Sequence, residues 1–376
     1  MTRVLMAEAT DFRGTTQVGS HAIARQFAQH GAEVCWLSVM MRSHNDPETR
    51  RRVQVWKQGG AVAEERITEY YARTFLPVVD RPLLRSRFLA RRTLDATTPS
   101  LRGVLKRLGF AQPDVLWLSN SRFSHALPRQ VRARVKVCRI SDDWEHFGTV
   151  PPALIALHDE TVDACDLVFV TSLRLKQKLA ARRPDAIYLP NAVADFFFDR
   201  PAAEPAMLSA FPRPRIVFVG KLDAWVDFDA IARVAERHPQ ASVLVVGPGT
   251  PAAREYPRNV HFTGPFPYRE LPWLLGFCDV GLVPFVKSEL THAVSPLKLF
   301  EYLACGLPTV ATRLDEIEAS KPPVTLCDNA DEMAAAVTTL LFDSGSRGMR
   351  IAYARENTWS KRFETIQDAL RTRGVT

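Results

Sequence analysis

Short apolar runs alternate with segments of helical periodicity through most of the chain. Such runs, each ending in polar residues or glycine, predict buried parallel strands, and the segments between them predict helices that cover the sheet. In the first half the predicted strands are 3–9, 33–39, 114–120, 135–141, 166–172 and 186–191, and a helix is predicted from Gly19 to His30.

The alternation lapses between Asp195 and Pro214 in a proline-rich stretch and then restarts. We interpret residues 196–214 as a linker between a first domain, 1–195, and a second domain, 215–355. The fold class predicted is α/β, with two doubly wound Rossmann-like domains facing a cleft. The second half has predicted strands 215–220, 242–247, 259–264, 279–285 and 324–328, and predicted helices 228–238, 268–277, 331–342 and 346–373.

The run SPLKLFEYLACGLPTVAT, residues 295–312, predicts a helix over 296–305. Ser295 is expected as its N-cap, Pro296 as its first residue and Gly306 as its stop. Lys298 then lies in the first turn, where the helix dipole disfavours a cation unless an anion such as phosphate binds there. Glu301 follows at i+3 on the same face, where it could accept hydrogen bonds from a ribose or form an exposed ion pair with Lys298.

Charge and cysteine content narrow the class of protein. The formal net charge of +8 implies an anionic partner, which could be a nucleic acid, a lipid surface or a phosphorylated small molecule. The six cysteines are scattered without C-x-x-C spacing, so we expect buried small apolar residues. The sequence has no apolar run long enough to span a membrane and no signal-peptide pattern at its start, and a cytoplasmic protein is expected.

Arginine concentrates in the first third, at 48–57, 81–94 and 101–110. Apolar residues within the last two runs have helical spacing, so these helices could lie on an anionic membrane surface or present a solvated basic face. The apolar residues concerned are Leu83, Leu84, Phe88, Leu89, Leu101, Val104, Leu105 and Leu108.

The run HAVSPLKLFEYLACGLPTVAT resembles the nucleotide-sugar-binding motif of GT-B fold glycosyltransferases, and the order of the other motifs extends the resemblance over nearly the whole chain. The resemblance implies that the second domain binds a nucleotide sugar, that the first binds the acceptor, and that a last helix, 356–376, returns to the first domain. It assigns Lys298 to the diphosphate and Glu301 to the ribose. It further assigns Gly220, Lys221, Gly264, Tyr268, His292 and Ser295 to the donor site.

One position departs from the family pattern. Retaining members often carry a second glutamate eight residues before the one that matches Glu301, and here that residue is Ala293. His292 and Glu289 lie nearby without replacing it, so we expect an inverting transfer. The layout is also similar to the membrane-associated, inverting glucuronosyltransferase of xanthan-type polysaccharide assembly.

An inverting transfer needs a base for the proton of the acceptor hydroxyl. The run SDDWEHF, 141–147, follows a predicted strand, and we expect Asp143 or Asp142 to be that base. A helix cap or an Asx turn is the structural alternative for both. Candidate acceptor-site residues are Gly14 and Gly19, which allow close backbone approach, and Thr171 and Ser172, which end a strand or cap a helix.

These observations favour a metal-independent glycosyltransferase that moves a hexose or uronic acid from a nucleotide diphosphate sugar, with a UDP-sugar favoured. The expected acceptor is a saccharide linked to polyprenyl diphosphate, for cell-surface polysaccharide such as exopolysaccharide, with peripheral contact at the inner face of the cell membrane. No cofactor is expected. The alternatives are a nucleotide-sugar 2-epimerase of the same fold and a non-catalytic nucleotide-sugar or nucleic-acid binding protein. Nucleic acid is disfavoured because RPLLRSRFLARR, 81–92, offers only Phe88 for stacking.

Overall fold

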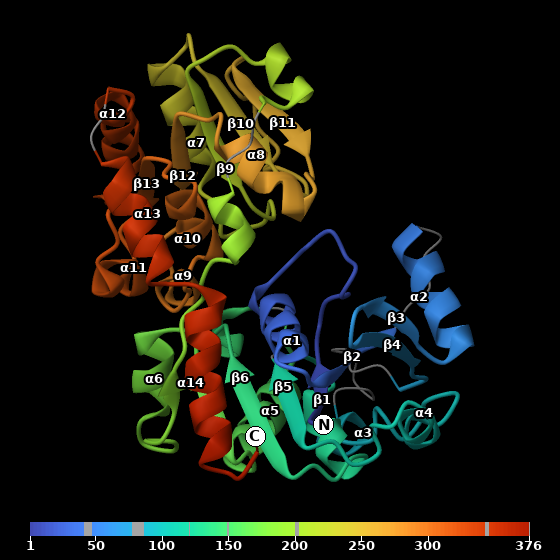
Figure 1. The fold of residues 1–376 in the computed structure, drawn as a ribbon. Coiled ribbons are helices and arrows are strands. Elements are labelled where there is room, and N and C mark those ends of the chain that lie inside the picture. Colours follow the sequence, from blue (N-terminus) through green and yellow to red (C-terminus); the bar gives the residue numbers. More distant parts are fainter. Residues whose placement is uncertain are drawn as a thin grey trace. The chain divides into compact units, whose positions relative to one another are not determined.

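The computed structural model describes residues 1–40, 47–76, 86–119, 121–148, 150–199, 203–342 and 346–375. The chain divides into two compact units, each built around its own sheet (Figure 1). Unit 1 comprises Met1–Pro190 and Phe363–Thr376, and unit 2 comprises Asn191–Arg362. The expected division of the chain into two α/β units is therefore present, with the first boundary at residue 190 where 195 was expected.

Unit 1 contains an eight-stranded sheet of order β3-β4-β2-β1-β5-β6-β7-β8, parallel except for the β3–β4 pair. The strand order reverses between β1 and β5, which lie side by side at the centre. The strands are β1 Arg3–Ala7, β2 Glu33–Met40, β3 Ala61–Glu64, β4 Ile67–Arg73, β5 Val115–Ser119, β6 Val135–Ile140, β7 Leu167–Val170 and β8 Ile187–Tyr188. Its helices are α1 Gly19–Gln29, α2 Pro47–Gln58, α3 Arg87–Ala90, α4 Leu101–Arg107, α5 Pro152–Asp163 and α6 Leu173–Leu179, with 3-10 turns η1 Ser124–Arg129 and η2 Trp144–His146.

The antiparallel hairpin β3–β4 has no counterpart among the predicted strands. Its sequence mixes charged and apolar residues without a long apolar run, and the turn between the strands contains Arg66 with a left-handed φ of 60°. The buried carboxylate of Glu69 on β4 fixes the hairpin, because Arg51 of α2 donates to it at 2.9 Å and Tyr71 donates at 2.9 Å. Arg51 is 18 residues away on another element, so local apolar patterning could not reveal the hairpin.

Unit 2 contains a six-stranded parallel sheet of order β11-β10-β9-β12-β13-β14, whose order reverses between β9 and β12. Successive residues of β9 point to opposite faces: Ile216 packs with α7 and α12, and Val217 packs with α8 and α10. The strands are β9 Arg215–Val219, β10 Ser242–Val246, β11 Val260–Gly264, β12 Val280–Val283, β13 Thr309–Thr312 and β14 Thr325–Cys327. The helices are α7 Phe228–Arg237, α8 Leu271–Leu275, α9 Glu289–His292, α10 Leu297–Ala304, α11 Asp315–Ser320, α12 Ala330–Leu340 and α13 Arg347–Arg355, with 3-10 turns η3 Asp195–Phe198, η4 Ala206–Ala210 and η5 Tyr268–Glu270.

The segment expected as a linker, 196–214, belongs to unit 2 in its described parts. Phe197 and Leu208 are buried in the same apolar cluster as Val217 and Leu299. The proline-rich composition suggested a linker, but these two side chains anchor the segment to the helices α8 and α10.

The single helix expected over 346–373 is instead two helices, α13 and α14 (Trp359–Arg371). The chain leaves the helical path because Val193 donates to the Asn357 carbonyl and accepts from the Trp359 amide, both at 3.0 Å. This bridge joins segments far apart in sequence. Residues from Phe363 onward belong to unit 1, which places most of the predicted returning helix there.

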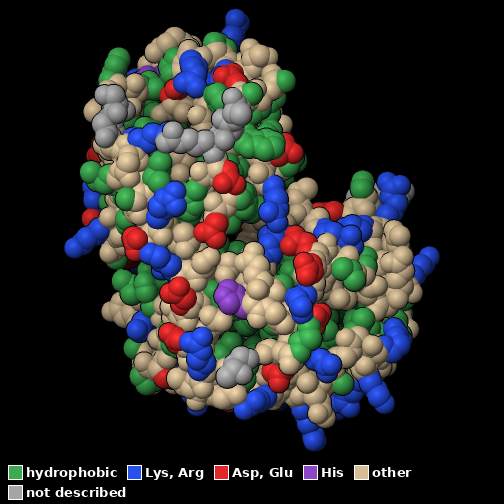
Figure 2. Space-filling view, viewed as in Figure 1, with side chains coloured by type: hydrophobic (Ala, Val, Ile, Leu, Met, Phe, Trp, Pro, Cys, Tyr) green, Lys and Arg blue, Asp and Glu red, His purple; other side chains and the backbone are tan. Residues whose placement is uncertain are grey.

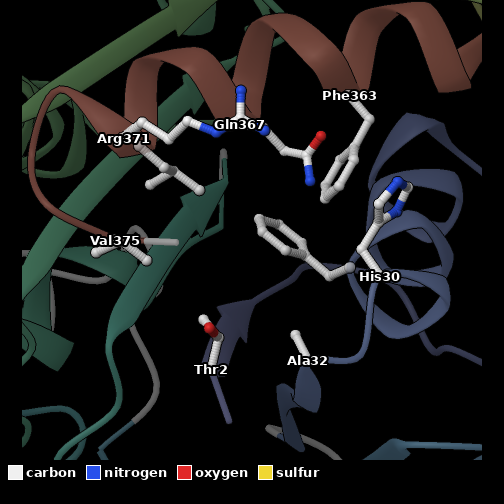
Figure 3. A pocket seen from close by; sticks show the side chains of 9 residues that line it. Thr2, His30, Ala32, Phe363, Gln367, Arg371 and Val375 are labelled. Carbon is white, nitrogen blue, oxygen red and sulfur yellow. The ribbon is translucent and has the colours of Figure 1, made fainter.

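Helix α14 packs beside α1 in unit 1 (Figure 1), and a pocket of about 160 Å³ opens between them. Phe363, Gln367 and Arg371 project from one face of α14 toward it, opposite His30, which directly follows α1 (Figure 3). Thr2 and Ala32, which also line it, precede β1 and β2. The pocket therefore lies at the amino edge of the sheet, away from the carboxyl edge where doubly wound folds bind their ligands.

All six cysteines are buried and free, as expected. Among the described residues no helix is long and apolar enough to cross a membrane. The predicted amphipathic helix at 101–110 is α4, and its Leu101, Val104 and Leu105 are buried in the protein, so this apolar face is not available to a membrane. Leu83 and Leu84 lie outside the described residues, and α3 presents Phe88, which is 61% exposed.

Candidate functional site

The order of the unit 2 strands reverses between β9 and β12, and two of the residues expected to bind the donor, Gly220 and Gly264, lie at the carboxyl ends of strands β9 and β11. Gly220 directly follows β9, and its amide donates to Val246 of β10 at 2.9 Å. A Cβ at Gly247 would overlap the Gly220 carbonyl oxygen, so glycine at 247 allows the two strand ends to meet. Helix α10 leaves from the loop after β12, which brings its first turn to the same edge.

Helix α10 begins at Leu297 with Pro296 as N-cap, so the expected N-cap role of Ser295 is wrong. Ser295 is buried and its Oγ accepts from the Asn191 amide at 3.2 Å, while Asn191 Nδ2 donates to the Ser295 carbonyl at 2.7 Å. The serine therefore fixes the loop that leads into α10. Gly306, with φ of 71°, ends the helix as expected.

Lys298 and Glu301 form an ion pair on one face of α10, with Nζ 2.6 Å from Oε2. The Glu301 side chain has no exposed area, whereas Lys298 is 24% exposed. Burial raises the pKa of Glu301, and the Lys298 ammonium and the Tyr268 hydroxyl oppose that rise. The other oxygen, Oε1, is buried and accepts no hydrogen bond within the described part of the chain. A buried carboxylate oxygen without a hydrogen-bond donor lowers the stability of the fold, so this atom is suited to accept from a ligand hydroxyl.

Tyr268 connects this ion pair to β11. The Lys298 Nζ lies 5.3 Å from the centre of the Tyr268 ring, and Tyr268 packs edge-on against Phe196 with ring centres 5.5 Å apart. Gly264 ends β11 with φ of 75°, and no atom lies within 4 Å of where a Cβ would be. Tyr268 therefore borders the α10 face, whereas Gly264 leaves open space at the end of β11.

Lys221 and His292 have partners of their own. Lys221 Nζ lies 2.6 Å from Asp223 Oδ2 and 5.2 Å from the Trp225 ring centre. His292 Nδ1 lies 2.7 Å from Asp315 Oδ1. Both side chains would need to change partners to contact a donor.

The two candidate bases of unit 1 have opposite environments. Asp143 caps η2, accepting from the Glu145 amide at 3.2 Å, and pairs with Lys178 Nζ at 2.7 Å. Burial would raise the pKa of Asp143, but Lys178 and then His146 outweigh it and hold the pKa below its usual value. Burial raises the pKa of Asp142, opposed by the Ser141 hydroxyl at 2.7 Å and by Arg139. Asp142 is thus the better proton acceptor.

The four residues expected at the acceptor site have local structural partners. Thr171 Oγ1 donates to the Ser141 carbonyl at 3.0 Å, and Ser172 caps α6 by accepting from the Leu175 amide at 3.2 Å. Gly19 is the first residue of α1. Gly14 lies in the loop after β1, with the site of a Cβ 3.2 Å from Asp11. Both glycines border the carboxyl edge of the unit 1 sheet.

Glu8 is a buried carboxyl that the sequence interpretation missed, because it assigned residue 8 to a predicted strand. It directly follows β1 at the point where the strand order of unit 1 reverses, and it is 2% exposed. Ser119 Oγ, at the end of β5, donates to Glu8 Oε1 at 2.6 Å. The signal that could have found it is a carboxylate directly after an apolar run, at the carboxyl end of a strand.

Residues 213–343 match the family described as "Glycosyl transferases group 1". A Bacillus subtilis (strain 168) protein, TuaH, assigned as a teichuronic acid biosynthesis glycosyltransferase, is 31% identical over 205 residues, which cover 50% of this chain and 52% of TuaH. The chain thus spans about half the length of this curated relative.

Solved structures extend the likeness to both units. Sucrose-phosphate synthase from Thermosynechococcus elongatus has a TM-score of 0.72 at 15% identity, over 99% of each chain. Anabaena HepE, in complex with UDP and glucose, has a TM-score of 0.68 at 14% identity, over 99% of this chain and 100% of HepE. These findings confirm the expected GT-B fold and the resemblance to GT-B glycosyltransferases, with the family match confined to residues 213–343. The similarity to a xanthan-type glucuronosyltransferase stays a prediction.

Proposed function

We propose that this protein is a glycosyltransferase that moves a hexose or uronic acid from a nucleotide diphosphate sugar to a saccharide acceptor. The observation that carries the proposal is the buried Glu301 on α10, paired with Lys298 through one oxygen and left with the other oxygen unpartnered. A ribose diol can supply hydroxyl donors to that oxygen, and a diphosphate can bind the Lys298 ammonium and the amides at the start of α10.

The donor favoured is a UDP-sugar. HepE, with the same fold, has been solved with UDP and glucose, which supports a UDP donor here. Lys298 and the helix amides would stabilise the charge that develops on the leaving diphosphate, and fixed donors of this kind supply a large share of the rate enhancement. The chemistry described requires no cofactor from the protein.

Asp142 is proposed as the base rather than Asp143, because Lys178 and His146 hold the Asp143 carboxylate in its ionised, weakly basic form. Asp142 would take the proton from the acceptor hydroxyl as its oxygen forms a bond to the anomeric carbon. The bond from that carbon to the phosphate oxygen breaks at the same time, and its electron pair leaves on the nucleotide diphosphate. The configuration inverts. Ala293, which is fully buried, has no carboxylate to support a retaining route.

The acceptor is proposed to be a saccharide on a polyprenyl diphosphate, bound by unit 1 at the inner face of the cell membrane. The assignment of TuaH to teichuronic acid biosynthesis supports a role in cell-surface polysaccharide synthesis. Gly14, Gly19, Thr171 and Ser172 are the candidate acceptor residues, although their present hydrogen bonds are local. Transfer to water-soluble saccharides, without transfer to lipid-linked saccharides, would contradict this choice of acceptor.

A basic surface with exposed aromatic residues supports the membrane contact. Figure 2 shows Lys and Arg side chains along the side of unit 1 that carries α2, α3 and α4. Phe75 and Phe88 are 63% and 61% exposed, with Arg73 and Arg92 stacked on their rings. Sedimentation with anionic vesicles tests this contact: the wild type should bind, and a Phe75→Ser, Phe88→Ser variant should bind more weakly.

The experiment that tests the proposed function is a product assay with the full chain and a panel of nucleotide sugars with lipid-linked saccharides. Transfer should release the nucleotide diphosphate and extend the acceptor, whereas a 2-epimerase would change the sugar without an acceptor. Lys298→Met should lose transfer, since the ammonium is removed while the stem is kept. Lys287→Ala breaks an exposed ion pair of unit 2, with Asp328 at 2.7 Å, and should leave transfer unchanged. Full transfer by Lys298→Met would refute the assignment.

A further inference from the structure

The first arginine-rich run of the sequence, residues 48–57, lies within α2 of unit 1. Arg51 and Arg52 of this helix both donate to Asp11, which lies in the loop after β1. That loop leaves from the carboxyl edge of the sheet, the edge at which doubly wound folds bind their ligands. Neither the proposed donor site nor the proposed base uses these arginines.

Two buried carboxylates join three arginines into one network. Glu69 of β4, whose side chain has no exposed area, accepts from Arg51 Nη1 at 2.9 Å and from Arg13 Nε at 2.8 Å. Asp11, with a side chain 4% exposed, accepts from Arg51 Nη2 at 2.9 Å and from Arg52 Nε at 2.7 Å. Arg51 therefore bridges the two carboxylates, and Arg13 and Arg52 lie at the two ends of the network.

The two outer arginines keep hydrogen-bond donors for a ligand. The side chains of Arg13 and Arg52 are 41% and 31% exposed. Within the described residues, Arg13 Nη1 and both terminal nitrogens of Arg52 donate no hydrogen bond to the chain. A guanidinium has five N–H donors in a planar arrangement, so the donors that a buried carboxylate holds also fix the direction of the others. Donors oriented in this way, on groups of positive charge, suit a phosphate.

Glu48 of α2 lies at the edge of this network. Its Oε2 is 3.5 Å from Arg52 Nη2, and its side chain is 47% exposed. An exposed pair of this kind contributes little to stability, so an anion could take the place of Glu48 beside Arg52. Gly14, one of the expected acceptor residues, borders the same place, because a Cβ there would lie 3.6 Å from Glu48 Oε1.

We propose that Arg13 and Arg52 form a diphosphate-binding site in unit 1, which holds the acceptor by the diphosphate of its lipid. This inference rests on the proposed function, in which the acceptor is a saccharide on a polyprenyl diphosphate. The three arginines of the network exceed its two buried carboxylates by one positive charge. A diphosphate carries its charge on two linked phosphoryl groups, which the two outer guanidiniums can bind. Arg51, 23% exposed, is the positioning residue, because it contacts both carboxylates.

Calorimetric titration with geranyl diphosphate tests this site. The full chain should carry Lys298→Met and Glu301→Gln, which remove the charges of the proposed donor site so that it does not compete. Arg13→Met and Arg52→Met, added singly, should each weaken binding about tenfold, because charge-assisted hydrogen bonds are lost. Each buried carboxylate still contacts Arg51 in these variants, so the fold should be retained. Absence of binding to the parent, or unchanged binding in both arginine variants, would overturn the proposal.

Glu48→Gln gives a test of opposite sign. It removes a negative charge beside Arg52 and should tighten the binding of geranyl diphosphate about two- to fivefold. Because Glu48 is exposed, this variant decides the question even if an arginine variant does not fold, and a failure to tighten binding would overturn the proposal. Arg182→Met is the matched control: Arg182 is 38% exposed, pairs with Asp159 and Asp163 of α5, and should bind the ligand as the parent does when replaced.

Transfer kinetics distinguish the acceptor from free diphosphate as the ligand. Arg52→Met in the otherwise wild-type chain should raise the KM for a saccharide on polyprenyl diphosphate about tenfold, with kcat and the donor KM unchanged, since the proposed donor residues are in unit 2. The KM for a saccharide without a diphosphate should stay at the wild-type value. An unchanged KM for the lipid-linked acceptor would overturn the acceptor assignment. Absence of transfer in the wild type would refute the proposed function, whereas the binding series decides separately whether unit 1 holds a diphosphate.

Discussion

Lys298 Nζ lies 2.6 Å from Glu301 Oε2 on the first two turns of α10, and Glu301 has no exposed side-chain area. The sequence left two interpretations open, an exposed ion pair or a ligand site. Full burial of the carboxylate, with one oxygen unpartnered, removes the first, because an exposed pair would be solvated at both oxygens. Burial of this pair therefore costs free energy of folding in the free protein, and hydrogen bonds from a bound donor could offset that cost.

The stability of Lys298 variants tests whether the Glu301 carboxylate is buried and depends on the Lys298 cation. Lys298→Met leaves the Glu301 carboxylate buried without a cation, and the free energy of unfolding at neutral pH should fall by about 3 kcal/mol. Adding Glu301→Gln to that variant removes the charge and should restore most of the loss. Urea unfolding of the single and double variants gives the coupling energy. Equal stability of the wild type and Lys298→Met would show that the pair is not strongly buried in solution.

Glu8 should give the protein a pH-dependent stability. Because the pKa of Glu8 rises from 4.5 to about 7 on folding, the folded state binds the proton more tightly than the unfolded state. Its contribution is fully present below about pH 4.5 and is lost as pH rises through about 7, by up to about 3 kcal/mol. Glu8→Gln cannot titrate, so it should be more stable than the wild type at pH 8. Thermal melting of both proteins across this range measures the difference; parallel curves would contradict the assigned environment.

Gly247 should tolerate no side chain. Its φ is 154° and a Cβ would overlap the Gly220 carbonyl oxygen, so Gly247→Ala must separate the ends of β9 and β10. We expect a loss of about 3 kcal/mol or more, or no soluble protein. Gly264→Ala is the matched control, because it has φ of 75° with open space at the Cβ and should lose only about 1 kcal/mol. Similar losses for the two variants would argue against the close strand approach.

Phe363 should hold α14 onto unit 1. Its ring lies 4.9 Å from the Phe27 ring, edge to face, and 4.7 Å from the His30 ring, and it is 2% exposed. Phe363→Ala should cost about 3 kcal/mol of unfolding free energy. Phe342→Ala removes the same group at a site that is 84% exposed and should change stability by less than about 0.5 kcal/mol. A small effect of Phe363→Ala, as measured by urea unfolding, would mean that α14 is held by other contacts.

The parts of this structure that local patterning determines were predictable. Apolar runs followed by glycine, such as 215–220, predicted central strands, and the Gly306 stop predicted the end of α10. Features that depend on distant partners were not. The break before Trp359 depends on Val193, and the β3–β4 hairpin depends on Arg51 contacting Glu69.

The candidate site was predictable to a similar degree. Lys298 and Glu301 could be paired from spacing alone, because a helix places i and i+3 on one face. The difference between Asp142 and Asp143 could not be predicted from the sequence, since it depends on the burial of Asp142 and on the pairing of Asp143 with Lys178 of α6. Ser295 was assigned as a cap from its residue type, whereas a tertiary hydrogen bond to Asn191 determines its role.

The central claim is that α10 binds the diphosphate and ribose of a nucleotide donor. Calorimetric titration of the full chain with UDP and with 2′-deoxy-UDP tests it directly, in the wild type and in Glu301→Ala. The wild type should bind UDP at least about tenfold more tightly than the deoxy compound, because a hydrogen bond to a charged acceptor is worth about 1.5 to 3 kcal/mol. Glu301→Ala should lose that preference. Equal affinity of the wild type for both ligands, or a preference that survives in Glu301→Ala, would contradict the account.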